Sequence, residues 1–222
     1  MDFVITGDGS KTIYNEEVGE HYHSKHGALQ ESKHVFLKSG LEFFLQREEK
    51  TSVSILEIGF GTGLNFITTA DYACANNIDL FYCGIEAYPL AKETISQIGY
   101  NEFVDQTLWS DYLSVYKQAL SAVCPINSKI NLQIAHTKVL EFNHETQFDI
   151  IYFDAFAAIH QPEMWSDETL AHVTSFLKPG GVFVTYAITG NLKRSMKALG
   201  FEIEKAPGAP GKREMLRAIK LV

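Results

Sequence analysis

The sequence has few cysteines and no long apolar run, and each shortage excludes a class of protein. Its three cysteines, Cys74, Cys83 and Cys124, are odd in number and show no CxxC spacing, which argues against a disulfide framework and a zinc knuckle. No stretch approaches the roughly 18 to 20 apolar residues that a membrane helix needs, so no membrane contact is expected. Residues 1–5 lack the basic segment and apolar run of a secretory signal. These absences predict a protein of the reducing cytoplasm.

Basic charge is also scarce, because the formal net charge is −8 at pH 7. This disfavours a nucleic-acid partner, whose phosphates need a basic surface. The charge is unevenly spread, however: from residue 189 onward eight basic residues stand against three acidic ones, which leaves this tail at +5. The asymmetry allows a basic patch on an acidic protein. A solvated helix followed by an edge strand explains it equally well.

Residues 1–50 are expected to form an N-terminal extension packed on the core. A Gly-rich turn at residues 7–10 between short apolar runs predicts a hairpin. Residues 27–48 then carry apolar positions at helical spacing. We therefore predict a hairpin and one helix that precede the main domain.

Residues 51–222 are expected to form one α/β domain, because short apolar runs alternate there with longer amphipathic segments. The runs lie at residues 52–58, 80–85, 130–135, 149–153, 182–187, 201–205 and 215–221. The last two are too close for a crossover helix and should pair antiparallel. Residues 100–128 are predicted to form an inserted helical region, with Trp109 in the core. The expected sheet is therefore mostly parallel and ends in an antiparallel hairpin.

The most specific motif is a strand that runs into glycines and then into a helix. Residues 55–66 read ILEIGFGTGLNF, which places Gly59, Gly61 and Gly63 after the acidic Glu57. Glycines let the backbone approach a ligand closely, and the helix N-terminus behind them offers unpaired amides. The third glycine comes one residue too early for a dinucleotide fingerprint. This spacing suits S-adenosylmethionine better, with Glu57 attracting its ammonium group; the alternative is a bare strand–helix turn.

Two further carboxylates end predicted strands. Glu86 closes the run after the glycine motif, where an acid can accept hydrogen bonds from both ribose hydroxyls. Asp154 closes the run 149–153 and should face the same crevice, because ligands bind beyond the carboxyl ends of parallel strands. There Asp154 could hold an attacking amine toward a methyl group. The alternatives are a solvated cap for Glu86 and a helix cap for Asp154.

Four histidines near the N-terminus suggest a metal site at first sight. They are His21, His23, His26 and His34. No cysteine or carboxylate lies nearby at a familiar ligand spacing, so we expect no metal.

Four segments resemble one family of bacterial tRNA-modifying enzymes. They are YHSxxGAxxESxxVFL at 22–37, GFGTGLNF at 59–66, DAFA through PEMW at 154–165, and KREML at 212–216. The family methylates 5-aminomethyl-2-thiouridine at the tRNA wobble position to 5-methylaminomethyl-2-thiouridine, and its methyltransferase domain is often fused to a flavin-dependent oxidase. The resemblance covers most of the chain. It implies a Rossmann-like class I S-adenosylmethionine-dependent methyltransferase fold with tRNA as partner, in the stand-alone form.

The resemblance also implies roles for single residues. Those expected at the cofactor are Glu57, Gly59, Phe60, Gly61, Gly63, Glu86 and Asp154. Those expected at the substrate are Tyr22, Ser24, Glu31, Phe156, Lys212 and Arg213, of which the two cations would hold tRNA phosphates. Asp154 would be the catalytic residue and would position the amine. Phe60 and Phe156, with Tyr186, could exclude water and face the cationic sulfur.

The chain departs from the family pattern at three positions. Ala158 stands where the family has proline, His160 stands near a family lysine, and Ala135-His136 replaces an acid that often binds adenine.

Three other functions compete with this one: a methyltransferase of a small amine, an aminopropyltransferase, and a non-catalytic RNA-binding protein. The first fits the net charge of −8 more comfortably. The intact glycine motif and Asp154 argue against the last.

Overall fold

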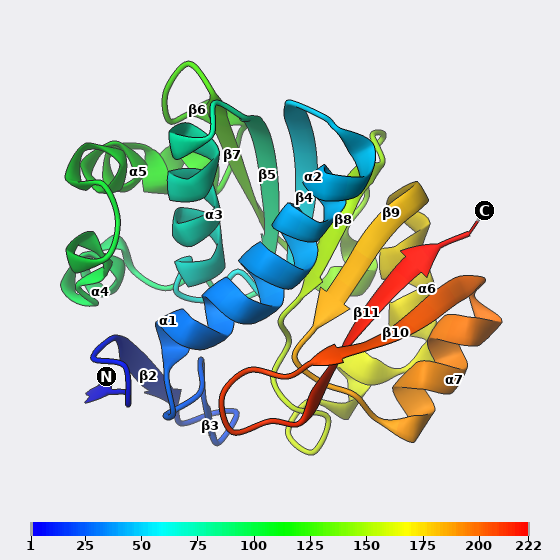
Figure 1. Ribbon diagram of the computed structural model, residues 1–222. Helices are drawn as coiled ribbons and strands as arrows, with labels where there is room; N and C mark the ends of the chain where they lie inside the picture. The colour runs from blue at the N-terminus through cyan, green and yellow to red at the C-terminus, as the bar shows by residue number, and fades with distance from the viewer. Residues whose placement is uncertain (1, 222) are drawn as a thin grey trace.

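A computed structural model describes residues 2–221, and within them the central feature is a sheet of eight strands in the order β10-β11-β9-β8-β4-β5-β7-β6 (Figure 1). The strands are β4 (Ser52–Ile58), β5 (Asp79–Glu86), β6 (Cys124–Pro125), β7 (Ile130–His136), β8 (Phe148–Phe153), β9 (Leu177–Thr185), β10 (Phe201–Pro207) and β11 (Glu214–Lys220). Every predicted apolar run forms one of these strands, which confirms the α/β fold class.

The pairing of the strands also follows the prediction. The pairs β4–β5, β4–β8, β5–β7 and β8–β9 are parallel, whereas β11 runs antiparallel to β9 and to β10. The short antiparallel strand β6 was not predicted. From β4 the chain first adds β5 and β7 on one side and then returns to β8 on the other. The carboxyl ends of β4 and β8 therefore lie at the switch point where such sheets bind ligands.

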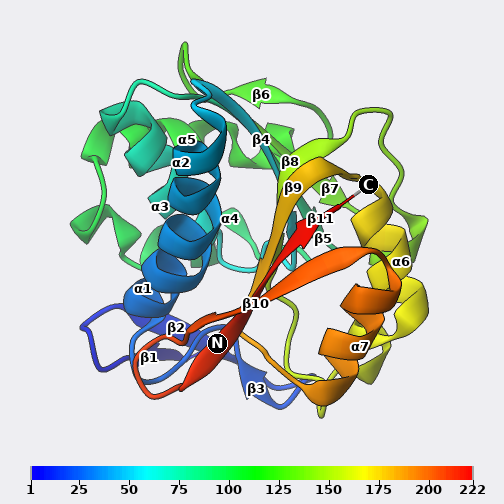
Figure 2. The ribbon, with the colours of Figure 1, turned by 45° about the vertical axis from the view of Figure 1, so that its right-hand side comes forward.

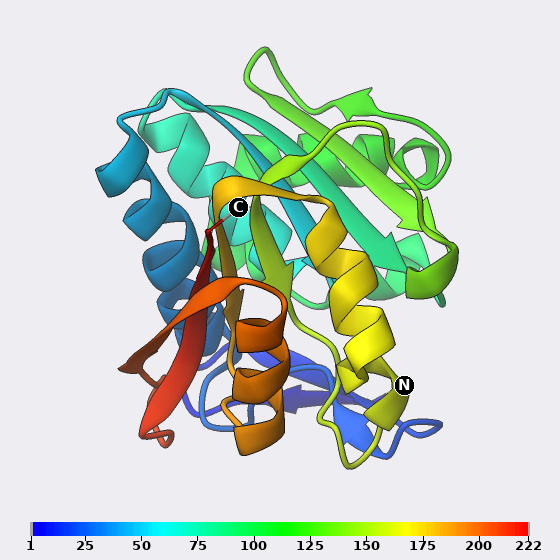
Figure 3. The ribbon, with the colours of Figure 1, turned by 90° about the vertical axis from the view of Figure 1, so that its right-hand side faces the viewer.

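Helices cover both faces of the sheet (Figures 2 and 3). They are α1 (Ala28–Glu31), η1 (Ser32–Glu42), α2 (Phe43–Glu48), α3 (Leu64–Ala75), α4 (Lys92–Gln97), η2 (Tyr100–Glu102), α5 (Gln106–Ala119), η3 (Val139–Glu141), η4 (Pro162–Trp165), α6 (Asp167–Ser175) and α7 (Gly190–Ala198). Because strand side chains alternate, Ile55 packs under η1, α3 and α5, whereas Leu56 packs with α6 and α7. Among residues 2–221, no helix is both long and apolar enough to cross a bilayer.

The N-terminal segment forms the predicted hairpin and helix, each with an addition. Strands β1 (Phe3–Ile5) and β2 (Lys11–Asn15) pair antiparallel, and β3 (Glu20–His21) adds a third strand. The predicted helix 27–48 is continuous, but its centre, η1, is a π-helix in which Ser39 Oγ donates to the carbonyl oxygen of His34. Gly40 allows η1 to lie close to the sheet, since a Cβ there would be 2.8 Å from the ring of Tyr152.

The predicted helical insertion between the second and third parallel strands is present as α4, η2 and α5. Four of its aromatic side chains are buried, Tyr100, Trp109, Tyr112 and Tyr116, and the 6% exposure of Trp109 confirms that it belongs to the core. The ring of Tyr112 contacts those of Phe66 on α3 and Trp109. This aromatic cluster supports the helix that follows the glycine motif.

Candidate active site

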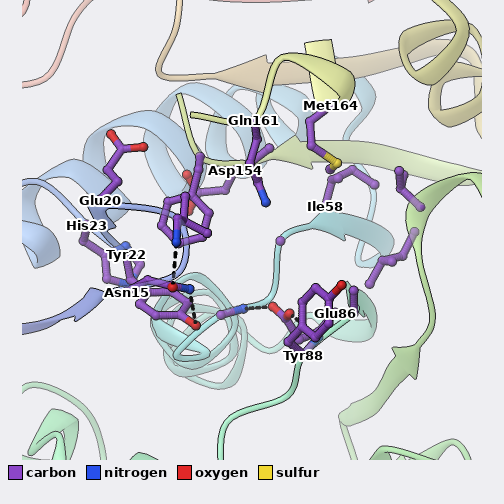
Figure 4. Close-up of a pocket in the computed structure, with 18 of the residues that line it drawn as sticks. Asn15, Glu20, Tyr22, His23, Ile58, Glu86, Tyr88, Asp154, Gln161 and Met164 are labelled. Carbon is purple, nitrogen blue, oxygen red and sulfur yellow. Dashed lines mark hydrogen bonds between the residues drawn. The ribbon is translucent and has the colours of Figure 1, made fainter. Parts of the chain in front are cut away.

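The main cavity lies at the carboxyl ends of β4, β5 and β8, under the N-terminal sheet. Its volume is about 980 Å³, within the range of small-molecule and cofactor sites. Its walls come from the glycine loop, the end of β5, the loop after β8 and residues 14–25. Figure 4 shows Tyr22, Glu86 and Asp154 around this hollow. The structure therefore brings the predicted cofactor and substrate segments into one space.

The glycine loop forms one edge of the cavity through Gly59 and Gly61. Both have positive φ, of 85° and 52°. A Cβ on Gly59 would lie 2.6 Å from the carbonyl oxygen of Asp154, and one on Gly61 would lie 2.9 Å from the ring of Tyr22. Only glycine therefore leaves room for β8 and for the N-terminal segment at this loop.

Glu86 lies in the cavity wall, as predicted, and is bound to the glycine loop. One carboxylate oxygen accepts the backbone N–H of Gly61 at 2.8 Å, and the other accepts that of Tyr88 at 2.9 Å. These two bonds hold the carboxylate at the end of β5. Each oxygen keeps a second lone pair with which to accept a ligand hydroxyl.

Glu57 lies behind the cavity wall rather than in it. It is completely buried; Asn65 donates to its Oε1 at 2.8 Å and Tyr82 donates to its Oε2 at 2.9 Å. Burial raises the pKa of Glu57 well above its usual range, and the charge of Asp154 adds to this effect. Phe60 and Gly63 also lie outside the lining, with the Phe60 ring packed against Gly84. The predicted cofactor contacts of these three residues stay predictions.

Asp154 lies in the cavity wall directly after β8. Asn65 Nδ2 donates to its Oδ2 at 2.7 Å, so a single amide group joins Asp154 to Glu57. Burial raises the pKa of Asp154 to about 8, and the nearby charge of Glu31 contributes in the same direction. At neutral pH this carboxyl group therefore keeps a proton for much of the time in the ligand-free protein.

The N-terminal segment covers the cavity with aromatic and polar side chains. The rings of Tyr22 and Phe156 lie 5.2 Å apart, and both residues line the cavity together with Ser24. His23 contacts Thr62 Oγ1 in the glycine loop at 2.8 Å. Because burial lowers the pKa of His23 to about 4, this imidazole is neutral at physiological pH.

The hairpin loop between β10 and β11 closes the cavity from the other side. Lys212 Nζ donates to Glu31 at 2.7 Å and lies 4.2 Å from the centre of the Tyr186 ring. Lys212, Glu31 and Tyr186 all line the cavity, whereas Arg213 is exposed and lies outside the lining. The structure thus brings five of the six predicted substrate residues together and leaves Arg213 apart.

Several lining residues were missed by the sequence reasoning. Glu20 accepts the backbone N–H of Ala157 at 2.9 Å and so ties β3 to the loop after β8. Glu141 lies in the wall beyond β7, in the region where Ala135-His136 suggested that an acid was missing. Neither had a signal in the sequence, because each lies in an element of two or three residues that no local pattern predicts. Asn65 did have one, since it follows the glycine motif directly.

The C-terminal half of the chain matches a known family. The family described as S-adenosyl-L-methionine-dependent methyltransferase matches residues 100–221, more than half of the chain. Within the described residues there is no group of three or more His, Cys, Asp or Glu side chains arranged to hold a metal ion.

Curated relatives match nearly the whole chain. The tRNA 5-methylaminomethyl-2-thiouridine biosynthesis bifunctional protein MnmC of Leptospira interrogans is 31% identical over 96% of this chain and 34% of its own length. The protein of the same name from Methylobacillus flagellatus is 28% identical over 91% of this chain and 33% of its own length. The chain thus spans about a third of the length of these relatives.

Solved structures show the same fold. MNMC2 from Aquifex aeolicus superposes with a TM-score of 0.79 at 21% identity, covering 98% of this chain and 69% of that one. The sugar N-methyltransferase KedS8 from Streptoalloteichus superposes with a TM-score of 0.53 at 12% identity, covering 87% of both chains. Both likenesses concern the fold.

Proposed function

Because the chain belongs to the family of S-adenosyl-L-methionine-dependent methyltransferases, we propose that it methylates the aminomethyl nitrogen of 5-aminomethyl-(2-thio)uridine at the tRNA wobble position. The product is 5-methylaminomethyl-(2-thio)uridine. The names of the MnmC relatives support this substrate, and their similarity extends over nearly the whole chain. The observation that carries the proposal is the Asp154 carboxyl group in the cavity wall beside Gly59, with its pKa raised to about 8.

The residues of the cavity fit the cofactor. Gly59 and Gly61 line the cavity, and a side chain on either would collide with the Asp154 carbonyl or the Tyr22 ring that form its walls. Glu86 is bound at the end of β5, where it can accept the ribose hydroxyls. The positive end of the helix dipole at the start of α3, directly behind the loop, favours the carboxylate of the amino-acid moiety. S-adenosylmethionine, when bound, supplies a methyl group on a positively charged sulfur.

Asp154 acts on the attacking amine. A free alkylamine has a pKa of about 10.4, like lysine, and is mostly protonated and unreactive at neutral pH. An ordinary aspartate is too weak a base to take that proton. With a pKa raised to about 8, the ionised form of Asp154 accepts that proton more readily than an ordinary aspartate does. The carbonyl oxygen of the resulting carboxylic acid can then accept a hydrogen bond from the neutral amine, which leaves the nitrogen lone pair free to attack. This adds a proton-accepting role to the positioning role that the sequence suggested.

The N-terminal extension completes the site. We assign residues 1–50 to this extension and 51–222 to the methyltransferase domain, with Tyr22 and Phe156 placed to exclude water from the reacting atoms. Lys212 already binds Glu31 and Tyr186, so its role is to hold the N-terminal extension in place over the cavity. Arg213 is left to meet an RNA phosphate outside the cavity. The protein acts in the cytoplasm, where its tRNA substrate is.

The test is methyl transfer from radiolabelled S-adenosylmethionine to tRNA from cells that lack the wobble methylation, followed by identification of the labelled nucleoside. We expect label in 5-methylaminomethyl-(2-thio)uridine. Asp154→Ala should abolish labelling with the cofactor dissociation constant within about threefold, whereas Asp111→Ala, on α5, should label normally. Label in a small amine but not in tRNA would instead establish the small-molecule function that the charge of −8 favours. Full activity of Asp154→Ala would refute its assigned role.

A further inference from the structure

A second hollow lies between helix α7 and the edge strand β10, outside the active site. Its volume is about 390 Å³, and it is lined by Gly190, Lys193, Arg194, Lys197, Ile203 and Lys205. Four of these six residues are cationic and none is acidic, on a protein whose formal net charge is −8. We call this hollow the α7–β10 groove.

The packing of α7 explains why its cations face outward together. Leu192 and Met196 are buried against the sheet, at 3% and 0% exposure. Lys193 and Lys197 are four residues apart and therefore lie on the same face of the helix. Like charges at this spacing destabilise a helix by a few tenths of a kcal/mol. Within residues 2–221, Lys193, Arg194 and Lys197 take part in no ion pair that offsets this repulsion.

Strand β10 keeps its carboxylates away from the groove. Ile203 and Lys205 point toward α7, so the alternation of side chains sends Glu202 and Glu204 to the other face. There Glu204 accepts a hydrogen bond from Arg217 Nε at 2.6 Å. Lys205 lies 3.8 Å from Glu214, but both side chains are about half exposed, so this pair neutralises the groove only weakly.

The groove opens at the same end of the molecule as the active site. Helix α7 begins five residues after β9 ends, at the carboxyl end of the parallel strands. The cavity lies at that end too, and in Figure 1 the N-terminal sheet and α7 both lie in the lower half of the molecule, on opposite sides. A single extended polyanion can therefore reach both.

We propose that the α7–β10 groove binds the phosphate backbone of the tRNA whose wobble uridine enters the cavity. This inference rests on the proposed function and adds the surface on which the RNA docks. Overall charge repels RNA from this protein, so binding depends on a local concentration of cations. Charge complementarity selects RNA because four cations with no carboxylate match closely spaced phosphates.

The test is the salt dependence of tRNA binding, measured by fluorescence anisotropy of the full-length protein with labelled tRNA. Each phosphate contact contributes about 0.7 to 0.9 to the slope of log K against log salt. Lys193→Gln with Lys197→Gln should lower that slope by about 1 to 2 and weaken binding about tenfold at low salt. The matched control, Lys117→Gln with Lys129→Gln, removes the same charge at the opposite edge of the sheet and should bind within twofold of the wild type.

Two readouts separate this inference from the proposed function. Turnover at saturating tRNA should not change in the groove variant, because α7 does not line the cavity. If the wild type methylates tRNA and the groove variant binds it like the control, the groove inference is wrong and the function stands. If the wild type neither binds nor methylates tRNA, the proposed function fails first. Lys205→Gln, on the strand, gives a second variant if the helix variant does not fold.

Discussion

Asn65 is the residue whose loss tests the arrangement around Asp154 most directly. Its side-chain amide donates to Glu57 at 2.8 Å and to Asp154 at 2.7 Å, and it is 2% exposed. Asn65→Ala removes both bonds without changing a group that contacts the reacting atoms. Asn65 is thus a positioning residue, and its effect on catalysis passes through Asp154.

The structure sets the expected size of the two effects. Both carboxyl groups have raised pKa values and are mainly protonated at neutral pH, so each hydrogen bond contributes about 0.5 to 1.5 kcal/mol, or about 1 to 3 kcal/mol for the pair. Asn65 Oδ1, however, is buried with no partner in the described structure, and its removal offsets about 1 to 3 kcal/mol. The free energy of unfolding should therefore fall by no more than about 2 kcal/mol, which leaves the protein folded. A catalytic group displaced by about 1 Å costs on the order of 100-fold in rate, so kcat should fall far more than stability suggests.

The assay combines methyl transfer at saturating substrates, cofactor affinity by calorimetry and denaturant unfolding. We expect kcat to fall roughly 100-fold, with cofactor affinity within about threefold. The hydrogen bond from Asn65 lowers the pKa of Asp154, so its loss should also move the midpoint of the pH–rate profile to a higher pH than in the wild type. Asn76→Ala is the matched control, since Asn76 follows the same helix α3 and donates only to the exposed carbonyl of Tyr72.

One result would refute this reasoning. If Asn65→Ala keeps the wild-type kcat and the wild-type pH profile, whatever its loss of stability, Asn65 is structural and does not position Asp154.

Three further predictions follow from the same site. Because the pKa of Asp154 is raised, its bound proton stabilises the folded state. This contribution is complete below about pH 4 and is lost as the pH rises through about 8. In urea titrations of the ligand-free protein, Asp154→Asn should therefore flatten the fall of the free energy of unfolding with pH. Gly59→Ala forces a non-glycine residue to φ 85° and places a Cβ 2.6 Å from a carbonyl oxygen. It should lower the free energy of unfolding by more than the about 1 to 3 kcal/mol of backbone strain alone. Calorimetry should show no cofactor binding to this variant. Lys212→Met breaks a partly exposed ion pair with Glu31, so it should change the free energy of unfolding by less than about 1 kcal/mol. It should nevertheless raise the KM for tRNA. An unchanged KM would count against a role of Lys212 in holding the N-terminal extension over the cavity.

The sequence by itself determined the sheet and the cofactor loop. Strand positions follow from apolar runs whose period is local, and the glycine motif between β4 and α3 is contiguous, so both were predictable without the fold. The final hairpin was predictable as well, because Ala206–Glu214 is too short to cross the sheet. Asp154 followed from its place at the end of a strand, since parallel strands share the edge at which ligands bind.

Only the tertiary structure decided which of these side chains reach the cavity. Glu57 alternates with Ile58 on β4 and points into the core, where Tyr82 and Asn65 bind it, and no local pattern reports that choice. The close approach of η1 to the sheet depends on Gly40 meeting Tyr152, a contact between residues 112 positions apart in the chain. The cover formed by Glu31 and Lys212 joins residues 181 positions apart. Long-range packing sets these contacts, because burial and charge depend on neighbours that only the folded chain brings together.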